Sequence, residues 1–458
     1  MFNKEIYINR RNQLKSQFNS GLLLFLGNEE SSMNYVDNVY TFRQDSTFLY
    51  YFGIDQAGLA AIIDLDNDTE IIFGDELSID HIIWMGNLPT LKERAENVGV
   101  SETKPTDTLA GYLKNKEVHY LPSYRPEHQI KLSNLLSRSI SEIDKNASEK
   151  LIIAIGEQRI IKAKEEIEQM DEAASITADM HLAAMRYAKP GMTEAQVAAK
   201  VREVALAQGN DISFPIIATI NGQTLHNHYH GNVIKEGDLF LLDTGASNPM
   251  HYAGDMTRTF PVSASFTNKQ REIYTIVLDA FYNSLEVLKP EVNYKEAHFA
   301  ACKTIFDGLK ALGITKGDTD QAVQEGAHAL FMPHGVGHLL GLDVHDMENF
   351  GEEYVGYAGE KKSTQFGLKS LRLGRVLKSG FVVTIEPGIY FIPELIDQWE
   401  SQGQHTTFIN FDKLKSYSDF GGIRIEEDVL VTDSGYRVLG KPLAKTVEEV
   451  EAERAKAF

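Results

Sequence analysis

Five side chains suited to binding metal ions recur along the second half of this chain, each inside a short motif of its own. Four are carboxylates and one is an imidazole: Asp243, Asp255, His338, Glu386 and Glu426. Carboxylates gathered in one cleft repel one another unless cations lie between them. Two divalent metal ions that share bridging carboxylates would balance this charge. The fold must therefore bring five motifs that are distant in sequence to one point.

The two aspartates flank a predicted pair of strands. Asp243 ends the apolar run 238–242, and Asp255 follows twelve residues later, just before the strand-like run 257–260. A hairpin-like turn between these runs would bring both carboxylates side by side. Taken alone, either aspartate could simply cap a turn. The motifs farther along the chain favour the metal site.

A histidine cluster supplies the imidazole ligand. His334, His338 and His345 fall within twelve residues, although the whole chain has only 14 histidines. Glycines between the first two allow the backbone to approach a ligand closely. Imidazole binds divalent metals, and a histidine that is not a ligand can exchange protons near neutral pH. We expect this cluster to be functional.

A second group of histidines lies earlier in the chain. His226, His228 and His230 would present three imidazoles on one face if the segment were a strand, so a separate histidine metal site is an alternative. Strand-like residues begin only after Gly237, however. A loop that contributes one functional histidine therefore fits the sequence better.

The two glutamates also lie at predicted strands. Glu386 ends the apolar run 381–385, and Glu426 closes the alternating run 422–426. In a strand with period two, Arg424 and Glu426 point to the same face. Arg424 could then orient a neighbouring carboxylate through a salt bridge, which is a supporting role at a metal site.

The length of the chain predicts two domains. Its 458 residues exceed what one hydrophobic core usually covers. Short apolar runs between residues 20 and 155 predict an N-terminal α/β domain with its own mixed sheet, over 1–156. The stretch 159–188 predicts a long amphipathic helix that ends before Pro190, and residues 157–458 form the second domain. The fold class is α/β (α+β).

Charge and cysteine content restrict partners and compartment. The formal net charge of -20 argues against nucleic acid or an anionic membrane as partner. The single cysteine, Cys302, excludes an intrachain disulfide, and its helix-like surroundings predict a buried structural thiol. The N-terminus lacks the apolar core of a secretory signal. We expect a cytoplasmic protein.

Together these motifs resemble the metal-dependent pita-bread peptidases, the group that contains methionine aminopeptidase, aminopeptidase P and prolidase. The resemblance covers nearly the whole chain, because segments 40–48 and 84–86 resemble N-terminal segments of the proline-specific members. It implies a C-terminal pita-bread catalytic domain and a homodimer. It also implies that the five ligands hold two divalent metal ions, usually Mn²⁺, with Zn²⁺ or Co²⁺ as alternatives.

The resemblance also implies roles for other residues. In this family the metal ions activate a water that attacks the carbonyl preceding proline, and Glu386 would carry the proton. His334 and His345 would stabilise the oxyanion and position the substrate. His226 follows Leu225, as in a motif of the family, and is therefore the expected active-site histidine.

The choice between prolidase and aminopeptidase P depends on three features, one of which is the stretch 420–428, which resembles prolidase more closely. The segment between Glu386 and Glu426 is long, as in prolidases. Segment 367–372 resembles the prolidase segment whose final arginine, here Arg372, grips the C-terminal carboxylate of a dipeptide. The sequence therefore favours an Xaa-Pro dipeptidase, with aminopeptidase P, which releases the N-terminal residue of longer Xaa-Pro peptides, as the alternative. A binding protein without activity on the same fold is a remote alternative, because all five ligands are present.

Overall fold

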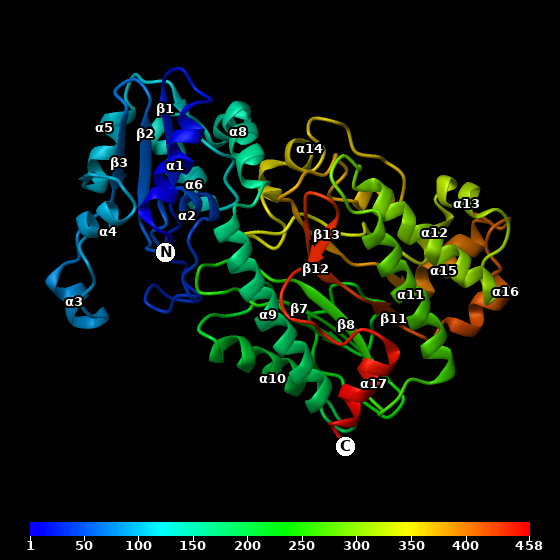
Figure 1. The fold of residues 1–458 in the computed structure, drawn as a ribbon. Helices are drawn as coiled ribbons and strands as arrows, with labels where there is room; N and C mark the ends of the chain where they lie inside the picture. Colours follow the sequence, from blue (N-terminus) through cyan, green and yellow to red (C-terminus); the bar gives the residue numbers. More distant parts are fainter. The chain divides into compact units, whose positions relative to one another are not determined.

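The computed structural model describes residues 1–458, and they form two compact units (Figure 1). The first contains residues 1–159 together with 349–354, and the second contains 160–348 and 355–458. The expected border after residue 156 falls inside helix α8 (Glu149–Arg159), at whose end the first unit stops. None of the helices combines the length and the apolar character needed to cross a membrane.

The first unit is built on a mixed five-stranded sheet, as the sequence predicts. The strand order is β4 (Glu102–Lys104), β3 (Thr69–Phe73), β2 (Ala60–Asp64), β1 (Leu22–Leu26) and β5 (Val118–His119). The three central strands are antiparallel, and the two edge strands run parallel to their neighbours.

The first unit also contains eight α-helices. They are α1 (Lys4–Lys15), α2 (Ser46–Phe52), α3 (Ile79–Met85), α4 (Leu91–Asn97), α5 (Leu109–Leu113), α6 (Pro126–Leu136), α7 (Ile140–Lys145) and α8. Alternate side chains of the three central strands, such as Leu22 and Leu24, point to one face and pack with α5, α6 and α7. The period-two pattern of the apolar runs therefore builds the core of this unit.

The second unit contains three small sheets. One holds β6 (Ile217–Thr219), β7 (Leu239–Thr244) and β8 (Met256–Pro261), all antiparallel. Another holds β13 (Tyr436–Val438), β12 (Glu427–Val431) and β9 (Val382–Ile385), and β10 (Gly388–Tyr390) pairs with β11 (Gly422–Arg424).

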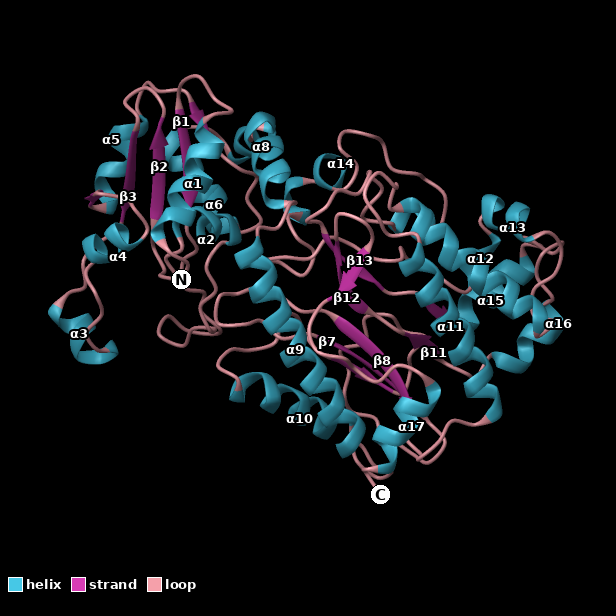
Figure 2. Ribbon diagram, in the orientation of Figure 1, coloured by secondary structure: helices cyan, strands magenta, loops and turns pink.

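Helices flank these sheets in the second unit. They are α9 (Lys164–Tyr187), α10 (Glu194–Ala207), α11 (Asn268–Glu286), α12 (Lys295–Ala311), α13 (Thr319–Glu325), α15 (Pro393–Ser401), α16 (Phe411–Leu414) and α17 (Val447–Ala455), while α14 (Glu352–Val355) begins in the first unit and ends in the second. Figure 2 shows the strands between α9 and α10 on one side and α11 and α12 on the other.

The helix predicted over 159–188 is interrupted, which corrects the sequence-based expectation. Helix α8 ends at Arg159 and α9 begins at Lys164. Between them the backbone N–H of Lys162 donates to the Gly380 carbonyl, and its ammonium forms a buried 2.8 Å ion pair with Asp346. These tertiary contacts outweigh helix propensity over the four connecting residues.

Candidate metal centre and its pocket

The β7–β8 hairpin brings the two aspartates together. Asp243 pairs with Thr257 across the hairpin, and Asp255 lies two residues before Thr257, so both carboxylates lie on the same face. They are 7% and 4% exposed. Glu426 joins them because its Oε2 accepts a 2.7 Å hydrogen bond from the Thr257 hydroxyl.

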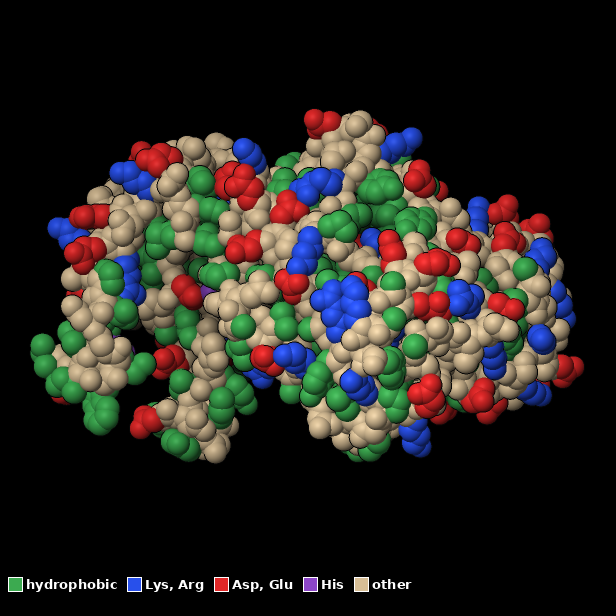
Figure 3. All heavy atoms as spheres, turned by 60° about the horizontal axis from the view of Figure 1, so that its bottom comes forward, with side chains coloured by type: hydrophobic (Ala, Val, Ile, Leu, Met, Phe, Trp, Pro, Cys, Tyr) green, Lys and Arg blue, Asp and Glu red, His purple; other side chains and the backbone are tan.

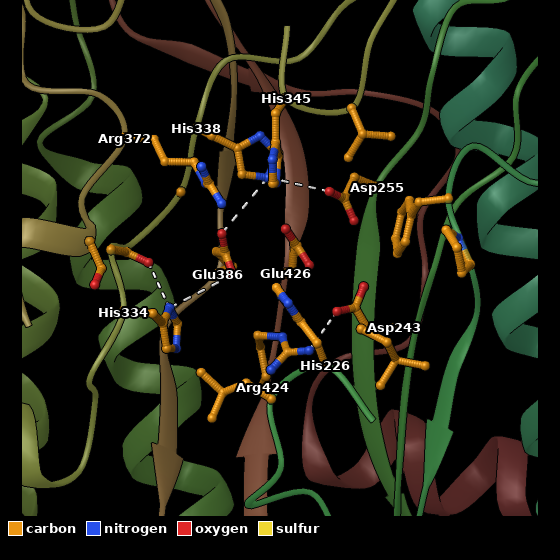
Figure 4. A pocket seen from close by; sticks show the side chains of 18 of the residues that line it. His226, Asp243, Asp255, His334, His338, His345, Arg372, Glu386, Arg424 and Glu426 are labelled. Carbon is orange, nitrogen blue, oxygen red and sulfur yellow. Dashed lines mark hydrogen bonds and ion pairs between the residues drawn. The ribbon is translucent and has the colours of Figure 1, made fainter. Parts of the chain in front are cut away.

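His338 and Glu386 complete the group from the neighbouring sheet. His338 Nε2 lies 3.4 Å from Asp255 Oδ2 and 3.8 Å from Glu386 Oε1 (Figure 4). Both residues are fixed by β9, because the Thr384 N–H donates to the His338 carbonyl and the Glu386 N–H donates to the Val336 carbonyl. The structure thus brings all five candidate ligands together.

The raised pKa values and unpaired oxygens of these carboxylates indicate that the group binds cations. Burial and neighbouring carboxylates raise the pKa of Asp255 and of Glu426 well above the ordinary values, and burial raises the pKa of Glu386 to about 7. Oδ1 of Asp243 and Oδ1 of Asp255 are buried and have no hydrogen-bond partner. Buried carboxylate oxygens that lack donors beside an imidazole are a donor set that fits divalent metal ions.

Arg424 forms the salt bridge that its position in the sequence predicts. Its Nη2 lies 2.5 Å from Asp243 Oδ2, and its Nε donates to the Thr257 hydroxyl at 3.1 Å. Its Nη1 donates to the Tyr390 hydroxyl at 2.7 Å. The guanidinium therefore fixes one oxygen of Asp243 and leaves the other for a ligand.

His334 is held in a defined tautomer. Its Nδ1 lies 2.7 Å from the Gly335 carbonyl, which only accepts, so Nδ1 carries the proton. Burial lowers the pKa of His334 to about 3, and the neutral ring leaves Nε2 as acceptor for the Tyr390 hydroxyl at 3.0 Å. Arg424, Tyr390 and His334 thus form one chain of hydrogen bonds at the edge of the metal centre.

Glu348 links two of the expected site residues and was not singled out in the sequence. Its Oε2 accepts from His345 Nδ1 at 2.6 Å, while its Oε1 pairs with Arg372. The hydrogen bond from His345 is the main cause that lowers the pKa of Glu348 to about 2. The spacing of three residues between His345 and Glu348 could have indicated this contact in the sequence. The contact with Arg372 could not be seen there, because Arg372 lies 24 residues after Glu348.

A cavity of about 570 Å³ opens onto the metal centre. All ten predicted site residues line it: His226, Asp243, Asp255, His334, His338, His345, Arg372, Glu386, Arg424 and Glu426. Its apolar wall comes from Phe214, Pro215, Ile217, Leu225, Pro333 and Val344. A pocket with an apolar wall and convergent charged groups is typical of a small-ligand site.

The three histidines at 226–230 do not form a separate metal site. His226 and His228 line the cavity, whereas His230 Nε2 donates to the Ile216 carbonyl at 3.0 Å. The segment is a loop before β7, as the sequence favours. Burial, followed by the charge of Arg424, lowers the pKa of His226, and the charge of Asp243 opposes this effect.

The fold and the buried carboxylate–imidazole centre define a metal-dependent hydrolase. Residues 168–433 match the model of metallopeptidase family M24, and residues 7–119 match the model of the aminopeptidase P N-terminal domain. The chain belongs to metallopeptidase family M24, has the pita-bread fold and is an enzyme of that family.

Relatives of both proline-specific types resemble the chain. It is 33% identical over 436 residues to the Xaa-Pro dipeptidase of Mus musculus, with 93% of this chain and 87% of the relative covered. It is 29% identical over 466 residues to the Xaa-Pro aminopeptidase of Escherichia coli, with 97% and 96% covered. The structure of the Pseudomonas aeruginosa aminopeptidase PepP superposes with a TM-score of 0.82 at 28% identity, covering 100% of this chain and 99% of the other.

Proposed function

We propose that this protein is an Xaa-Pro dipeptidase that hydrolyses the peptide bond before proline with two divalent metal ions. The observation that carries the proposal is Arg372, a guanidinium on the wall of the cavity that contains the metal centre. The named relatives include both a dipeptidase and an aminopeptidase, and the names of both refer to Xaa-Pro substrates. They differ in whether the substrate is limited to a dipeptide. Arg372 supplies a physical reason for that limit.

The metal ions are held by the five ligands in this proposal. The donor set of four carboxylates and one imidazole is hard, which favours Mn²⁺ over thiophilic metals. When bound, such ions lower the pKa of water toward neutrality and polarise a carbonyl. Glu386 then takes the proton of the attacking water on a carboxylate oxygen and delivers it to the proline nitrogen as the C–N bond breaks.

The residues around the metal centre position the substrate. Both ring nitrogens of His334 are engaged, by Gly335 and Tyr390, so His334 orients the substrate by contact. Nδ1 of His345 donates to Glu348 and its Nε2 has no hydrogen-bond partner, so Nε2 is available to contact the substrate. Burial lowers the pKa of His345, so this ring is neutral until it takes up a proton during the reaction. His226 lines the cavity beside them.

The limit to dipeptide substrates follows from the charge of the substrate's C-terminal carboxylate. A proline carboxylate is planar, and a guanidinium binds it with two parallel hydrogen bonds. In a longer peptide the same position is a neutral amide with no charge to offer Arg372. Binding energy for the carboxylate is therefore available only to a dipeptide.

The test compares two substrates at the same Mn²⁺ concentration. We expect kcat/KM for Ala-Pro to exceed that for Ala-Pro-Ala, because only the dipeptide offers a carboxylate to Arg372. Strong cleavage of the tripeptide with weak cleavage of the dipeptide would instead favour an aminopeptidase P. Assays after chelation and after Mn²⁺ is restored show whether either activity depends on metal.

Aminopeptidase P remains the second candidate, because a specific observation favours it. Nη1 of Arg372 is already paired with Glu348, so the guanidinium has a charged partner without any substrate carboxylate. The chain is also similar along its full length to the aminopeptidase PepP structure. A protein without activity is disfavoured, because the chain is a family M24 metallopeptidase with its ligands assembled.

A homodimer in the cytoplasm is also part of the proposal. Helix α3 exposes Ile79, Ile83, Trp84 and Met85, and Trp84 is 84% exposed. Figure 3 shows hydrophobic side chains gathered on this projecting segment. A second copy would cover this surface, so we expect sedimentation of a dimer and a shift toward monomer in Trp84→Asp.

The only cysteine is a free thiol, which suits a reducing compartment.

A further inference from the structure

A second group of potential metal ligands lies in the second unit, outside the cavity. Helix α12 carries His298 and Cys302, which are one turn apart and therefore lie on the same face. The 3₁₀ helix η2 (Ala327–Leu330) contributes His328. The first two side chains are fully buried and His328 is 1% exposed.

The spacing of this group matches a metal site. One potential ligand atom from each residue lies within 4.8 Å of the other two. His298 Nε2 and Cys302 Sγ are 3.5 Å apart. In a tetrahedral zinc site, metal–sulfur and metal–nitrogen bonds of about 2.3 and 2.0–2.1 Å put such atoms about 3.5–3.6 Å apart. The side chains therefore require little rearrangement to share one ion.

Hydrogen bonding within the protein does not satisfy this group. The only hydrogen bond within the group joins the Cys302 thiol to Nε2 of His298. Nδ1 of His298 is buried without a hydrogen-bond partner, and the His328 ring interacts with one backbone group only, that of Val323, which leaves one of its two buried nitrogens unpaired. An unpaired buried polar group costs about 1–3 kcal/mol, so the unpaired nitrogen of His328 beside the Cys302–His298 pair indicates a missing ligand.

The protonation states agree with this interpretation. Burial lowers the pKa of His328 to about 4, against a smaller contribution from the Val323 backbone, and lowers the pKa of His298 well below its ordinary value. Both imidazoles are therefore neutral and have a lone pair available to a cation. Burial raises the pKa of the Cys302 thiol, and a bound metal ion would displace its proton.

We infer that His298, Cys302 and His328 bind one thiophilic cation, of the Zn²⁺ or Cu⁺ class, at a site separate from the metal centre. A thiolate with two imidazoles selects such ions over Mn²⁺. The ion would tie α12 to η2, and His328 lies six residues before His334 and ten before His338. Its role is then to anchor the start of the segment that carries two site histidines.

Cobalt is a sharp probe of this site. A thiolate bound to Co²⁺ gives a sulfur-to-metal charge-transfer absorption in the near ultraviolet, and Cys302 is the only cysteine of the chain. Any such absorption in the folded protein must therefore come from this site. We expect it when wild type, freed of bound metal by chelation, is titrated with Co²⁺, and we expect its loss in Cys302→Ser and in His328→Asn treated in the same way.

Matched controls separate this site from the metal centre. Asp243→Asn removes a proposed catalytic ligand and should leave the charge-transfer absorption unchanged. Metal analysis of purified wild type should find one Zn²⁺ or Cu⁺ per chain that Cys302→Ser lacks, and the identity of that metal distinguishes the two ions. Metal-free wild type that shows no charge-transfer absorption in excess Co²⁺ would overturn the inference, whether or not the variants fold.

Discussion

Removing the guanidinium of Arg372 should selectively impair cleavage of dipeptides. Hydrogen bonds to a charged group contribute about 1.5–3 kcal/mol. Before substrate binds, Arg372 pairs with Glu348, and these side chains are 33% and 40% exposed. Giving up a pair this exposed costs about 1 kcal/mol at most. Subtracting this cost leaves about 0.5–2 kcal/mol, so kcat/KM for Ala-Pro should fall about 2- to 30-fold in Arg372→Ala, mainly through KM.

The substrate itself supplies the control for this prediction. Ala-Pro amide has the same peptide bond without the carboxylate, so Arg372→Ala should change its kcat/KM less than about 2-fold. Lys369→Ala removes an equal charge from the same segment, but Lys369 does not line the cavity, and it should behave as wild type with both substrates. An equal fall for the dipeptide and its amide, or no fall for either, would refute the carboxylate role.

Three further results are expected. Glu348→Gln removes the ion pair between Glu348 and Arg372, while the new amide oxygen can still accept from His345, so steady-state assays should show KM for Ala-Pro about 2- to 5-fold lower, and a higher KM would contradict this competition. The pKa of Glu386 in the metal-free protein, about 7, is raised above its unfolded value, so its stabilising contribution is full below about pH 4.5 and is lost as pH rises through 7. Thermal melts should therefore show a larger gain from Mn²⁺ at pH 8 than at pH 5.5, and equal gains would contradict the assignment. Arg424→Gln breaks a buried ion pair and should lower the free energy of unfolding by about 3–5 kcal/mol in denaturant titrations, whereas a loss below about 1 kcal/mol would mean that its partner carboxylate is satisfied in another way.

Part of the candidate metal centre was predictable because Asp243 and Glu386 stand at the ends of recognisable apolar strands. The runs before Asp243 and Glu386 are apolar and end at the carboxylate, so local sequence marks both the strand and the functional residue. Glu426 was expected within a strand, but it lies in the break between β11 and β12, where its N–H donates to the Thr257 carbonyl. That break depends on the neighbouring hairpin, and no periodicity in the sequence reveals it.

The parts that were missed depend on contacts between distant segments. Tyr390 and Thr257 connect Arg424 to its neighbours through hydroxyl groups that look ordinary in the sequence. Cys302 was expected to be buried, and it is, but its approach to His328 depends on how α12 packs against η2. Such partners become visible only when the packing is known.

The most direct test of the metal centre is a crystal structure of the wild-type protein with Mn²⁺, with the ions located by their anomalous scattering. We predict two peaks, both surrounded by the side chains of Asp243, Asp255, His338, Glu386 and Glu426. A single peak or none among these five residues would contradict the proposed two-metal hydrolase.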